Sequence, residues 1–459
     1  MAIKVDLEKA YDRIWWEFVE DSLKDLELPQ QIIRIIMKCV STTTMQISWN
    51  RALTEEFRPE KVIIQGDPHS PYLFVIGMER LSHTINKAVD EGRWKPLRLS
   101  RDRSPISHLF FADDLVLFSR ADCSNAKAIK ELLDQFSQYS GHRVSINKTQ
   151  LYFSPNTDAD TAREIESIFH FKVVDNLGMY LGIPLLHGRV TGANFMYITD
   201  KVQRRLNRWS AASLSMARRV TLAKAILSAI PTYCMQVVRL HANVIDEIEK
   251  LIRRFEWGGS EQQTKLCLVN WKTVCRPIRL GIHDLKTHNQ EFMIKLGFHL
   301  VSKDKSLWAR ILREKYKVNS ACLAVIKRSS SSFVWRSLSR IWDHVCNNIC
   351  WSIGDGVRTN FWYDTWIPSL GPLVAHKVND LPAVVDASIS NMVNHVGEWD
   401  WPNFQDLLSH GTCCKIASTC PHAAEAGSDV CTWSWASNGK FSVRGAYDLL
   451  SVDTITYTK

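Results

Sequence analysis

Long hydrophobic runs are missing from this chain of 459 residues. No stretch approaches the roughly 18 to 20 uninterrupted apolar residues that a membrane-spanning helix needs. The first residues, MAIKVDLEKAYD, include the acidic side chains Asp6, Glu8 and Asp12, whereas a secretory or transit peptide is uncharged or basic there. We therefore expect an intracellular protein with no signal peptide and no transmembrane segment.

The cysteines also lack a pattern. Twelve cysteines are too few for a disulfide scaffold over this length, and no two of them stand in C-x-x-C spacing. Cys414, Cys420 and His422 are residue types that bind zinc, but no fourth ligand stands at a suitable distance along the chain. We therefore expect reduced thiols and no zinc.

Apolar residues are abundant enough for sizeable cores: the chain is 45% hydrophobic and 23% charged, which predicts two or three globular domains. The net charge of +9 is concentrated in the middle of the chain. Residues 200–256 carry 11 basic and 5 acidic side chains, whereas residues 320–459 carry 10 basic and 12 acidic ones. A polyanionic partner for the middle segment is one interpretation, and a solvated helix face is the other.

Tryptophan marks a change in composition, because ten of the 17 lie after residue 300. The serine run at 329–332 and the Gly371-Pro372 pair read as loops or linkers, and no repeat of 20 to 50 residues is present. We therefore place the main boundary near residue 320. The tryptophans suit a protein-interaction surface, but they suit a hydrophobic core equally well.

Helical and extended patterns alternate at the start of the chain. Residues 3–7 alternate apolar and polar side chains, which predicts a strand, and a helical pattern with Phe18, Leu23 and Leu26 follows. A second helix is expected through Ile32–Met37, and a third at Leu73–Leu81 after the turn at residues 66–68.

Further along, the pattern predicts a hairpin, with strands at His108–Phe111 and Leu115–Phe118 and with Asp113 and Asp114 at its tip. Residues 143–153 read as another strand pair, and residues 196–256 read as helical.

Two adjacent carboxylates on a tight turn repel each other unless a cation neutralises them, so Asp113 and Asp114 suggest a metal site. Asp6, at the end of a predicted strand, is the third candidate ligand. Oxygen ligands suit Mg²⁺, and two such ions can activate a 3′-hydroxyl and stabilise a leaving pyrophosphate. Taken alone, the Asp-Asp turn is weak evidence for a metal site, and a solvent-exposed hairpin is the better interpretation.

The order of the motifs resembles the reverse transcriptases of plant LINE-type non-LTR retrotransposons. The resemblance rests on five segments in the family's order: KVDLEKAYD (4–12), QGDPHSPYLF (65–74), FADD (111–114), SGHRV with Asn147 and Lys148 (140–148), and YLGIPL (180–185). It continues through residues 206–231, FEWGG (255–259), WKTVCRP (271–277), GDG (354–356), FWYDTW (361–366), and the WSW and GKFSV segments (433–443). The last of these are similar to the start of a zinc-binding module that commonly follows the polymerase.

The resemblance implies a mixed α/β fold: a right-hand polymerase palm with a small antiparallel sheet and packed helices (1–187), a helical thumb (188–320) and a Trp-rich C-terminal region (321–459). It implies RNA-directed DNA polymerase activity with two Mg²⁺ or Mn²⁺ ions held by Asp6, Asp113 and Asp114. The partners of such a polymerase would be an RNA template with a DNA primer and deoxynucleoside triphosphates. It would be located in the nucleus if it acts on chromosomal DNA.

The same resemblance implies roles for further residues. Lys148 would stand near the departing pyrophosphate, Tyr11 would exclude a 2′-hydroxyl, and Gln65 and Gly66 would lie near the nucleotide. Nucleic acid would be contacted by Tyr180, Leu181, Gly182, Arg204, Arg205, Arg208, Arg218 and Arg219. From the residues alone, a core aromatic, a turn glycine and an exposed lysine are the alternative interpretations.

Several positions depart from the family's pattern. Residues 61–64 read KVII where Arg-Gly-Leu-Arg is usual, His69 and Glu256 replace leucines, and Arg218 stands at a position that prefers glycine. We also expect the fingers subdomain to be missing, and this chain to be impaired or inactive as a polymerase. A catalytically dead remnant that only binds nucleic acid is the alternative function.

Overall fold

The computed structural model describes residues 1–59, 61, 63–98, 105–209, 211–259, 269–275, 282–302, 306–318, 326, 331–378, 387–421 and 423–456. The chain forms two compact units, Met1–His187 and Gly188–Lys459. Val62, residues 276–281, the 319–325 stretch and His422, which take part in patterns discussed above, lie outside the described residues.

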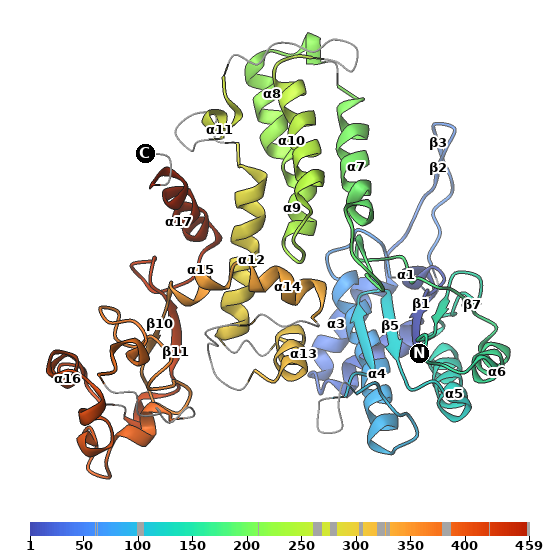
Figure 1. Cartoon of the computed structure of the whole chain (residues 1–459). Coiled ribbons are helices and arrows are strands. Elements are labelled where there is room, and N and C mark those ends of the chain that lie inside the picture. The colour runs from blue at the N-terminus through green and yellow to red at the C-terminus, as the bar shows by residue number, and fades with distance from the viewer. Residues whose placement is uncertain are drawn as a thin grey trace. The chain divides into compact units, whose positions relative to one another are not determined.

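A five-stranded sheet with the order β4-β5-β1-β6-β7 is the centre of the first unit (Figure 1). The middle strand, β1 (Ala2–Val5), pairs antiparallel with β5 (Asp114–Phe118) on one side and with β6 (Gln150–Tyr152) on the other. Strand β4 (His108–Phe111) lies outside β5, and β7 (Lys172–Val173) pairs in parallel with β6. Because β1 is paired on both sides, its position is fixed by two sets of backbone hydrogen bonds.

The predicted helices of the first unit are confirmed. The described helices are α1 (Ala10–Arg13), α2 (Trp16–Asp25), α3 (Gln30–Ser41), α4 (Ser70–Asp90), α5 (Cys123–Ser140) and α6 (Ala159–Phe169). Two short hairpins complete the unit: β2 (Ser48–Trp49) with β3 (Ala52–Leu53), and β8 (Met179–Tyr180) with β9 (Ile183–Pro184).

The core of this unit lies between the sheet and its helices. Residues at alternate positions of β1 and β5 share one buried cluster with apolar side chains of α4 and α5. The sheet contributes Ile3, Val5, Leu115 and Leu117, and the helices contribute Phe74, Met78, Leu81, Ile85, Ile129, Leu132, Leu133 and Phe136. Since successive side chains of a strand point to opposite faces, residues at the other set of positions lie on the face away from this cluster.

The hairpin expected around Asp113 is confirmed, with one change. Phe111 pairs with Asp114, so only Ala112 and Asp113 form the turn, and Asp114 begins β5. Ala112 adopts a positive φ of 52°, which such a two-residue turn requires.

The strand pair predicted at residues 143–153 was wrong. Val144 makes an isolated bridge to Leu7, residues 145–149 form a turn, and only Gln150–Tyr152 is a strand, paired with β1. The two apolar stretches pair with the N-terminal strand and its extension instead of with each other. Alternation within a segment predicts extended backbone, but it does not identify the partner strand.

The helical pattern of residues 196–256 is confirmed in the second unit. It comprises α7 (Met196–Leu206), α8 (Met216–Leu222), α9 (Ala229–Met235) and α10 (Ala242–Glu256), with a π-helical turn at Ala223–Leu227 between α8 and α9. Helix α10 buries an apolar stripe, and its basic residues Arg253 and Arg254 lie in the last turn.

Helix α12 (Leu285–Val301) is the centre of the rest of this unit. It packs against α9, α10, α14, α15 and α17, so the described residues on both sides of residue 320 share its contacts. The three-part division at residues 187 and 320 stays a prediction. The other elements are α11 (Trp271–Val274), α13 (Leu307–Tyr316), α14 (Phe333–Ser339), α15 (Trp342–Cys346), α16 (His410–Ala417), α17 (Val443–Thr456), and the strand pair β10 (Ile349–Ser352) and β11 (Val430–Trp433).

The whole described chain is therefore mixed α/β, with small sheets and many helices. Within the described ranges, the structure contains no helix that is both long enough and apolar enough to cross a bilayer.

Gly141 ends α5, and its missing side chain lets the segment between α1 and α2 pack closely against it. Its φ is +81°, and a Cβ at this position would lie 2.5 Å from the Arg13 carbonyl and 2.6 Å from the Trp15 ring. We predict that Gly141→Ala lowers the free energy of unfolding by about 2 kcal/mol or more, because it adds a clash to the strain of the positive φ. Chemical denaturation measures the change.

Gly92→Ala is the matched control. Gly92 also has a positive φ, +71°, but nothing lies within 4 Å of its would-be Cβ. It should therefore lose only about 1 kcal/mol, the backbone cost alone. Equal losses for the two variants would contradict the packing role of Gly141.

Candidate active site

Strand register brings the three predicted carboxylates to one place. Val5 pairs with Leu115 in an antiparallel register, so one step forward from Val5 and one step back from Leu115 set Asp6 opposite Asp114. Both lie on the sheet face away from the buried Val5 and Leu115, and Asp113 lies in the adjoining turn. Together with Lys4, Leu7, Lys148 and other residues, the three carboxylates line a pocket of about 160 Å³.

The backbone at Asp6 is held on both sides. Its amide donates a hydrogen bond to Thr149 Oγ1 at 3.2 Å, and its carbonyl accepts one from the Ser145 amide at 2.8 Å. These contacts tie the turn at residues 145–149 to the end of β1. They also place Lys148 beside the pocket, with its Nζ 4.0 Å from Asp6 Oδ1. Both side chains are well exposed, so this ion pair itself adds little stability.

The donor set of the pocket suits a hard divalent cation. Ionised carboxylates supply only oxygen acceptors, which is the chemistry Mg²⁺ prefers. Across the described residues, however, no three carboxylate, imidazole or thiol groups already lie close enough to hold one ion. Repulsion between like charges favours separated rotamers, and a divalent cation would draw the three side chains together.

Tyr11 is fixed beside this pocket by stacking. Its ring lies on the ring of Phe74 in α4, with centroids 4.6 Å apart and an interplanar angle of 20°. Its carbonyl accepts a hydrogen bond from the Ile63 amide at 3.0 Å. Burial, followed by the charge of Asp113, raises the pKa of the Tyr11 phenol. The Tyr11 side chain is therefore neutral and held in place, and it lies close enough to Asp113 for the carboxylate charge to affect its pKa.

Gln65 and Gly66 come shortly after Ile63, whose amide is bonded to the Tyr11 carbonyl. Both residues are exposed, and Gly66 has a φ of +98°, a conformation open to glycine. The next residue, Asp67, accepts hydrogen bonds from the His69 amide at 3.0 Å and from His69 Nδ1 at 3.2 Å. The hydrogen bond from the His69 backbone amide is the main factor that lowers the pKa of Asp67. His69, a departure from the family's leucine, thus stabilises the turn that begins α4.

The β8–β9 hairpin lies against the same strands. Leu181 and Gly182 form its turn with positive φ values of 49° and 73°. The Tyr180 hydroxyl is 3.5 Å from the Asp114 carbonyl, and Lys4 Nζ donates to the Met179 carbonyl. Burial, and then the charge of Asp114, raises the pKa of Tyr180. Tyr180 therefore joins the carboxylates spatially, although it is far from them in sequence.

Lys4 and Thr149 contribute to the site and were not predicted from the sequence. Lys4 lies two residues before Asp6 and so shares its sheet face, a period-2 signal that was available in the sequence. Thr149 offered no such signal, because its hydroxyl meets the Asp6 amide only through the tertiary fold.

The predicted nucleic-acid arginines divide into two groups. Arg204, Arg205, Arg208 and Arg218 have exposed side chains on α7, the loop after it and α8. Arg219 is different: its guanidinium donates to the backbone carbonyls of Glu256, Ala211 and Leu214. Arg219 therefore ties the end of α10 to the start of α8. Its assignment to a phosphate backbone stays a prediction.

Glu256 is buried at the end of α10, with 1% of its surface exposed. Its Oε1 has no hydrogen-bond partner among the described residues. Burial raises the pKa of Glu256 to about 7, and Lys224 opposes this shift. The folded state therefore retains this proton to a much higher pH than the unfolded chain, whose ordinary glutamate pKa is about 4.3.

We predict that Glu256→Leu stabilises the protein increasingly as the pH rises. The glutamate's contribution is most favourable below its unfolded pKa and is lost as the pH passes through about 7, by roughly 2 to 3 kcal/mol. Unfolding free energies at pH 5 and pH 8 measure the difference. Glu247→Leu, on the same helix, is the control, because the Glu247 side chain is 42% exposed and pairs with Lys250. It should show no such pH dependence, and equal behaviour of both variants would contradict the burial argument.

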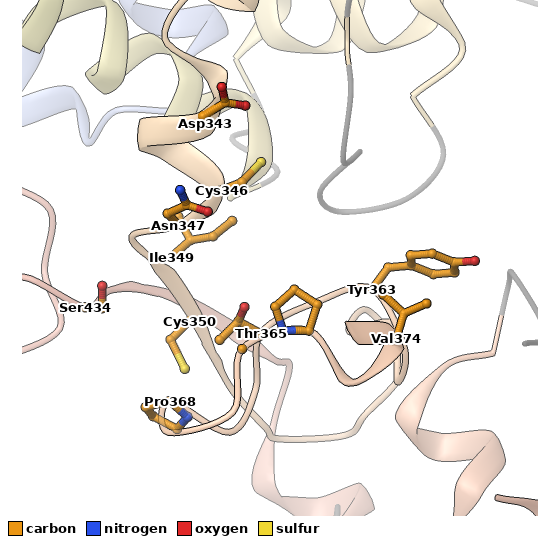
Figure 2. Close-up of a pocket in the computed structure, with 12 residues that line it drawn as sticks. Asp343, Cys346, Asn347, Ile349, Cys350, Tyr363, Thr365, Pro368, Val374 and Ser434 are labelled. Atoms are coloured by element: carbon orange, nitrogen blue, oxygen red, sulfur yellow. The ribbon is translucent and has the colours of Figure 1, made fainter. Parts of the chain in front are cut away.

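A larger pocket of about 420 Å³ belongs to the second unit (Figure 2). Figure 2 shows Asp343, Cys346 and Asn347 from α15 and its end, and Ile349 and Cys350 from β10. Its other lining residues are Tyr363, Thr365, Pro368, Gly371, Pro372, Val374 and Ser434. With a single carboxylate and no basic side chain, this lining does not suit phosphoryl transfer, so the carboxylate pocket of the first unit remains the candidate active site.

Residues 1–185 match the family described as reverse transcriptase (RNA-dependent DNA polymerase). All the residues that line the carboxylate pocket lie within this stretch, and so do Tyr11 and Tyr180. Residues 1–185 are thus similar to nucleic-acid polymerases, and in particular to the reverse transcriptase family. The resemblance to non-LTR retrotransposon reverse transcriptases is confirmed by this match and by the relatives that follow.

A putative ribonuclease H protein from Arabidopsis thaliana is 30% identical over 280 residues, which cover 60% of this chain and 45% of that protein. An uncharacterized mitochondrial protein from the same plant is 28% identical over 149 residues, 32% of this chain and 97% of that protein. The retrovirus-related Pol polyprotein from type-2 retrotransposable element R2DM of Drosophila melanogaster is 26% identical over 145 residues, 31% of this chain and 13% of the polyprotein. The chain thus spans less than half the length of the first of these relatives.

Among solved structures, a telomerase from Candida albicans in complex with a TWJ fragment of telomeric RNA is 11% identical. The match covers 69% of this chain and 50% of the telomerase, with a TM-score of 0.34. A likeness this weak supports no conclusion about function.

Proposed function

We propose that the first unit is the palm of an RNA-directed DNA polymerase of a non-LTR retrotransposon, which extends a DNA primer on an RNA template. One observation carries the proposal: the β1–β5 register sets Asp6 opposite Asp114, beside Asp113, in one pocket of a reverse transcriptase domain. Asp6, Asp113 and Asp114 would hold two Mg²⁺ ions, which supply activation of the attacking hydroxyl and charge neutralisation at the phosphate.

Lys148 is proposed to act on the leaving side of the reaction. Its side chain is 74% exposed and lines the pocket, with Nζ 4.0 Å from Asp6 Oδ1. A cation there would stabilise the negative charge that develops on the departing pyrophosphate, or donate a proton to it.

Tyr11, Gln65 and Gly66 are proposed to form the nucleotide side of the pocket. The stacked Tyr11 ring cannot move away without breaking its contact with Phe74, so it is suited to exclude a 2′-hydroxyl. Gly66 lets the backbone approach a ligand closely, because no side chain intervenes.

The primer and the duplex are proposed to contact two further surfaces. The hairpin of Tyr180, Leu181 and Gly182 would hold the primer near the carboxylates, since Tyr180 lies next to the Asp114 backbone. In the second unit, which would be the thumb, the exposed Arg204, Arg205, Arg208 and Arg218 would meet backbone phosphates.

We predict that Asp113→Asn lowers primer extension on an annealed RNA template with Mg²⁺ by about a hundredfold or more, because it removes a proposed metal ligand. Asp134→Asn, on the exposed side of α5, is the control and should extend normally. Extension by the parent chain that Asp113→Asn leaves intact would refute the assignment. No extension by the parent chain, with salt-sensitive binding retained, would favour the alternative function, a remnant that only binds nucleic acid.

We also predict that replacing Arg204 and Arg205 together by Gln weakens binding of a primer–template duplex and flattens its salt dependence. Each lost phosphate contact should reduce the slope of log K against log salt by about 0.9. Duplex titrations at two or more salt concentrations measure the slope. Lys415→Gln, on the exposed face of α16, should leave the slope unchanged.

A further inference from the structure

The tryptophans after residue 300 are mostly core residues. Seven of the ten are buried: Trp335, Trp342, Trp351, Trp362, Trp366, Trp399 and Trp433. Trp308 and Trp401 are partly buried, and Trp435 alone of the ten is exposed, at 45%. Burial in a hydrophobic core therefore explains most of these tryptophans, but it does not explain the exposed Trp435.

Trp435 lines an open groove of about 420 Å³. The groove is formed by the loop that follows β11 and by the first turns of α17. Its other lining residues are Ala436, Ser437, Asn438, Lys440, Phe441, Ser442, Arg444, Gly445 and Asp448.

The loop that carries Trp435 is held firmly. The Trp433 amide donates to the Gly439 carbonyl at 2.8 Å, and the Gly439 amide donates to the Ala436 carbonyl at 2.9 Å. Ser434 donates through both its amide and its hydroxyl to the Asn348 carbonyl. An aromatic side chain on such a loop loses little conformational entropy when a ligand stacks on it.

An aromatic layer lies beneath the groove. Phe441 stacks on Phe298 of α12 with centroids 5.0 Å apart, and its ring meets Trp433 edge-on at 5.0 Å. The floor of the groove is therefore part of the hydrophobic core, whereas Trp435 stands at its exposed side.

The rim of the groove is basic and polar. Lys440 and Arg444 are exposed, and among the described residues neither makes an ion pair, while Asp448 is the one carboxylate in the lining. Asn438 Oδ1 accepts a hydrogen bond from the Lys440 amide at 3.0 Å. Ser437 adds a further exposed hydroxyl.

We propose that this groove binds single-stranded nucleic acid, with one base stacked on Trp435 and the flanking phosphates paired with Lys440 and Arg444. An exposed aromatic ring and cations in one groove are the features that hold an unpaired base and its backbone. A base inside a duplex has no free face for the indole, so the groove selects single strands. The proposal does not depend on polymerase activity, because every residue it uses belongs to the second unit.

The test measures binding of a six-nucleotide fluorescent oligouridine to the full chain by anisotropy. Arg204→Glu and Arg205→Glu are introduced in every sample, so that the proposed duplex surface does not mask the groove. We expect Trp435→Ala to weaken binding by about tenfold or more, and Trp435→Phe, which keeps a stacking ring, to weaken it much less. Lys440→Glu should also weaken binding, whereas Lys415→Glu and Trp49→Ala, at exposed positions outside the groove, should not.

A second measurement locates the contact directly. The oligomer is made with 5-iodouridine and cross-linked by ultraviolet light, and an adduct on Trp435 is expected by peptide mapping. Lys440→Glu keeps the test valid if Trp435→Ala lowers the melting temperature, because Lys440 is exposed and its substitution leaves the aromatic layer intact.

Unchanged affinity in Trp435→Ala and Lys440→Glu, or an adduct that maps elsewhere, would overturn the proposal and leave the groove to a protein partner. Equal losses in Trp435→Phe and Trp435→Ala at unchanged melting temperature would rule out stacking. Primer extension is scored separately, so a chain without polymerase activity can still confirm the groove, and an active chain can still refute it.

Discussion

The double pairing of strand β1 is the constraint on which the candidate active site depends. β1 is bonded antiparallel to β5 and β6 at once, and its register with β5 sets Asp6 opposite Asp114. A slip of one residue would turn Asp6 toward the buried face and Val5 toward solvent. Val5 and Leu115 are buried in the apolar cluster. Because neighbouring side chains of a strand point to opposite faces, Asp6 and Asp114 must then point to the other face of the sheet.

Buried contacts connect the remaining motifs to this strand. His142 is 1% exposed; its Nε2 lies 3.0 Å from the Ala10 carbonyl, its Nδ1 lies 2.9 Å from Ser140 Oγ, and its ring stacks on Phe136. Burial lowers the pKa of His142 to about 4, so the imidazole is neutral at physiological pH. Together with the Tyr11–Phe74 stack, it connects the start of α1 to α4 and α5, so that the site rests on rigid helices.

In the second unit, a buried carboxylate connects segments that are distant along the chain. Asp429 accepts hydrogen bonds from the amides of Gly354 and Gly356 at 2.7 and 2.9 Å, and from the amides of Arg358 and Thr359 at 3.0 Å. Burial alone would raise the pKa of Asp429, but these hydrogen bonds lower it below its ordinary value. The Gly354-Asp355-Gly356 segment is thus shaped around a carboxylate more than 70 residues later, and a Cβ at Gly354 would lie 2.2 Å from the Gly427 carbonyl.

The sequence by itself determined that helices form around residues 32–37, 73–81 and within 196–256, that a hairpin forms at Asp113, and that residues 1–185 resemble reverse transcriptases, because these depend on local periodicity and on residue identity at fixed spacings. Only the tertiary structure decided that Leu151 pairs with β1 and Val144 with Leu7 just beyond it, that Arg219 is bound by three carbonyls while Arg204 is exposed, and that Trp435 alone of the ten tryptophans after residue 300 is exposed. Two arginines or two tryptophans are identical in sequence, and their roles differ because residues distant along the chain cover one of them and leave the other open to a ligand.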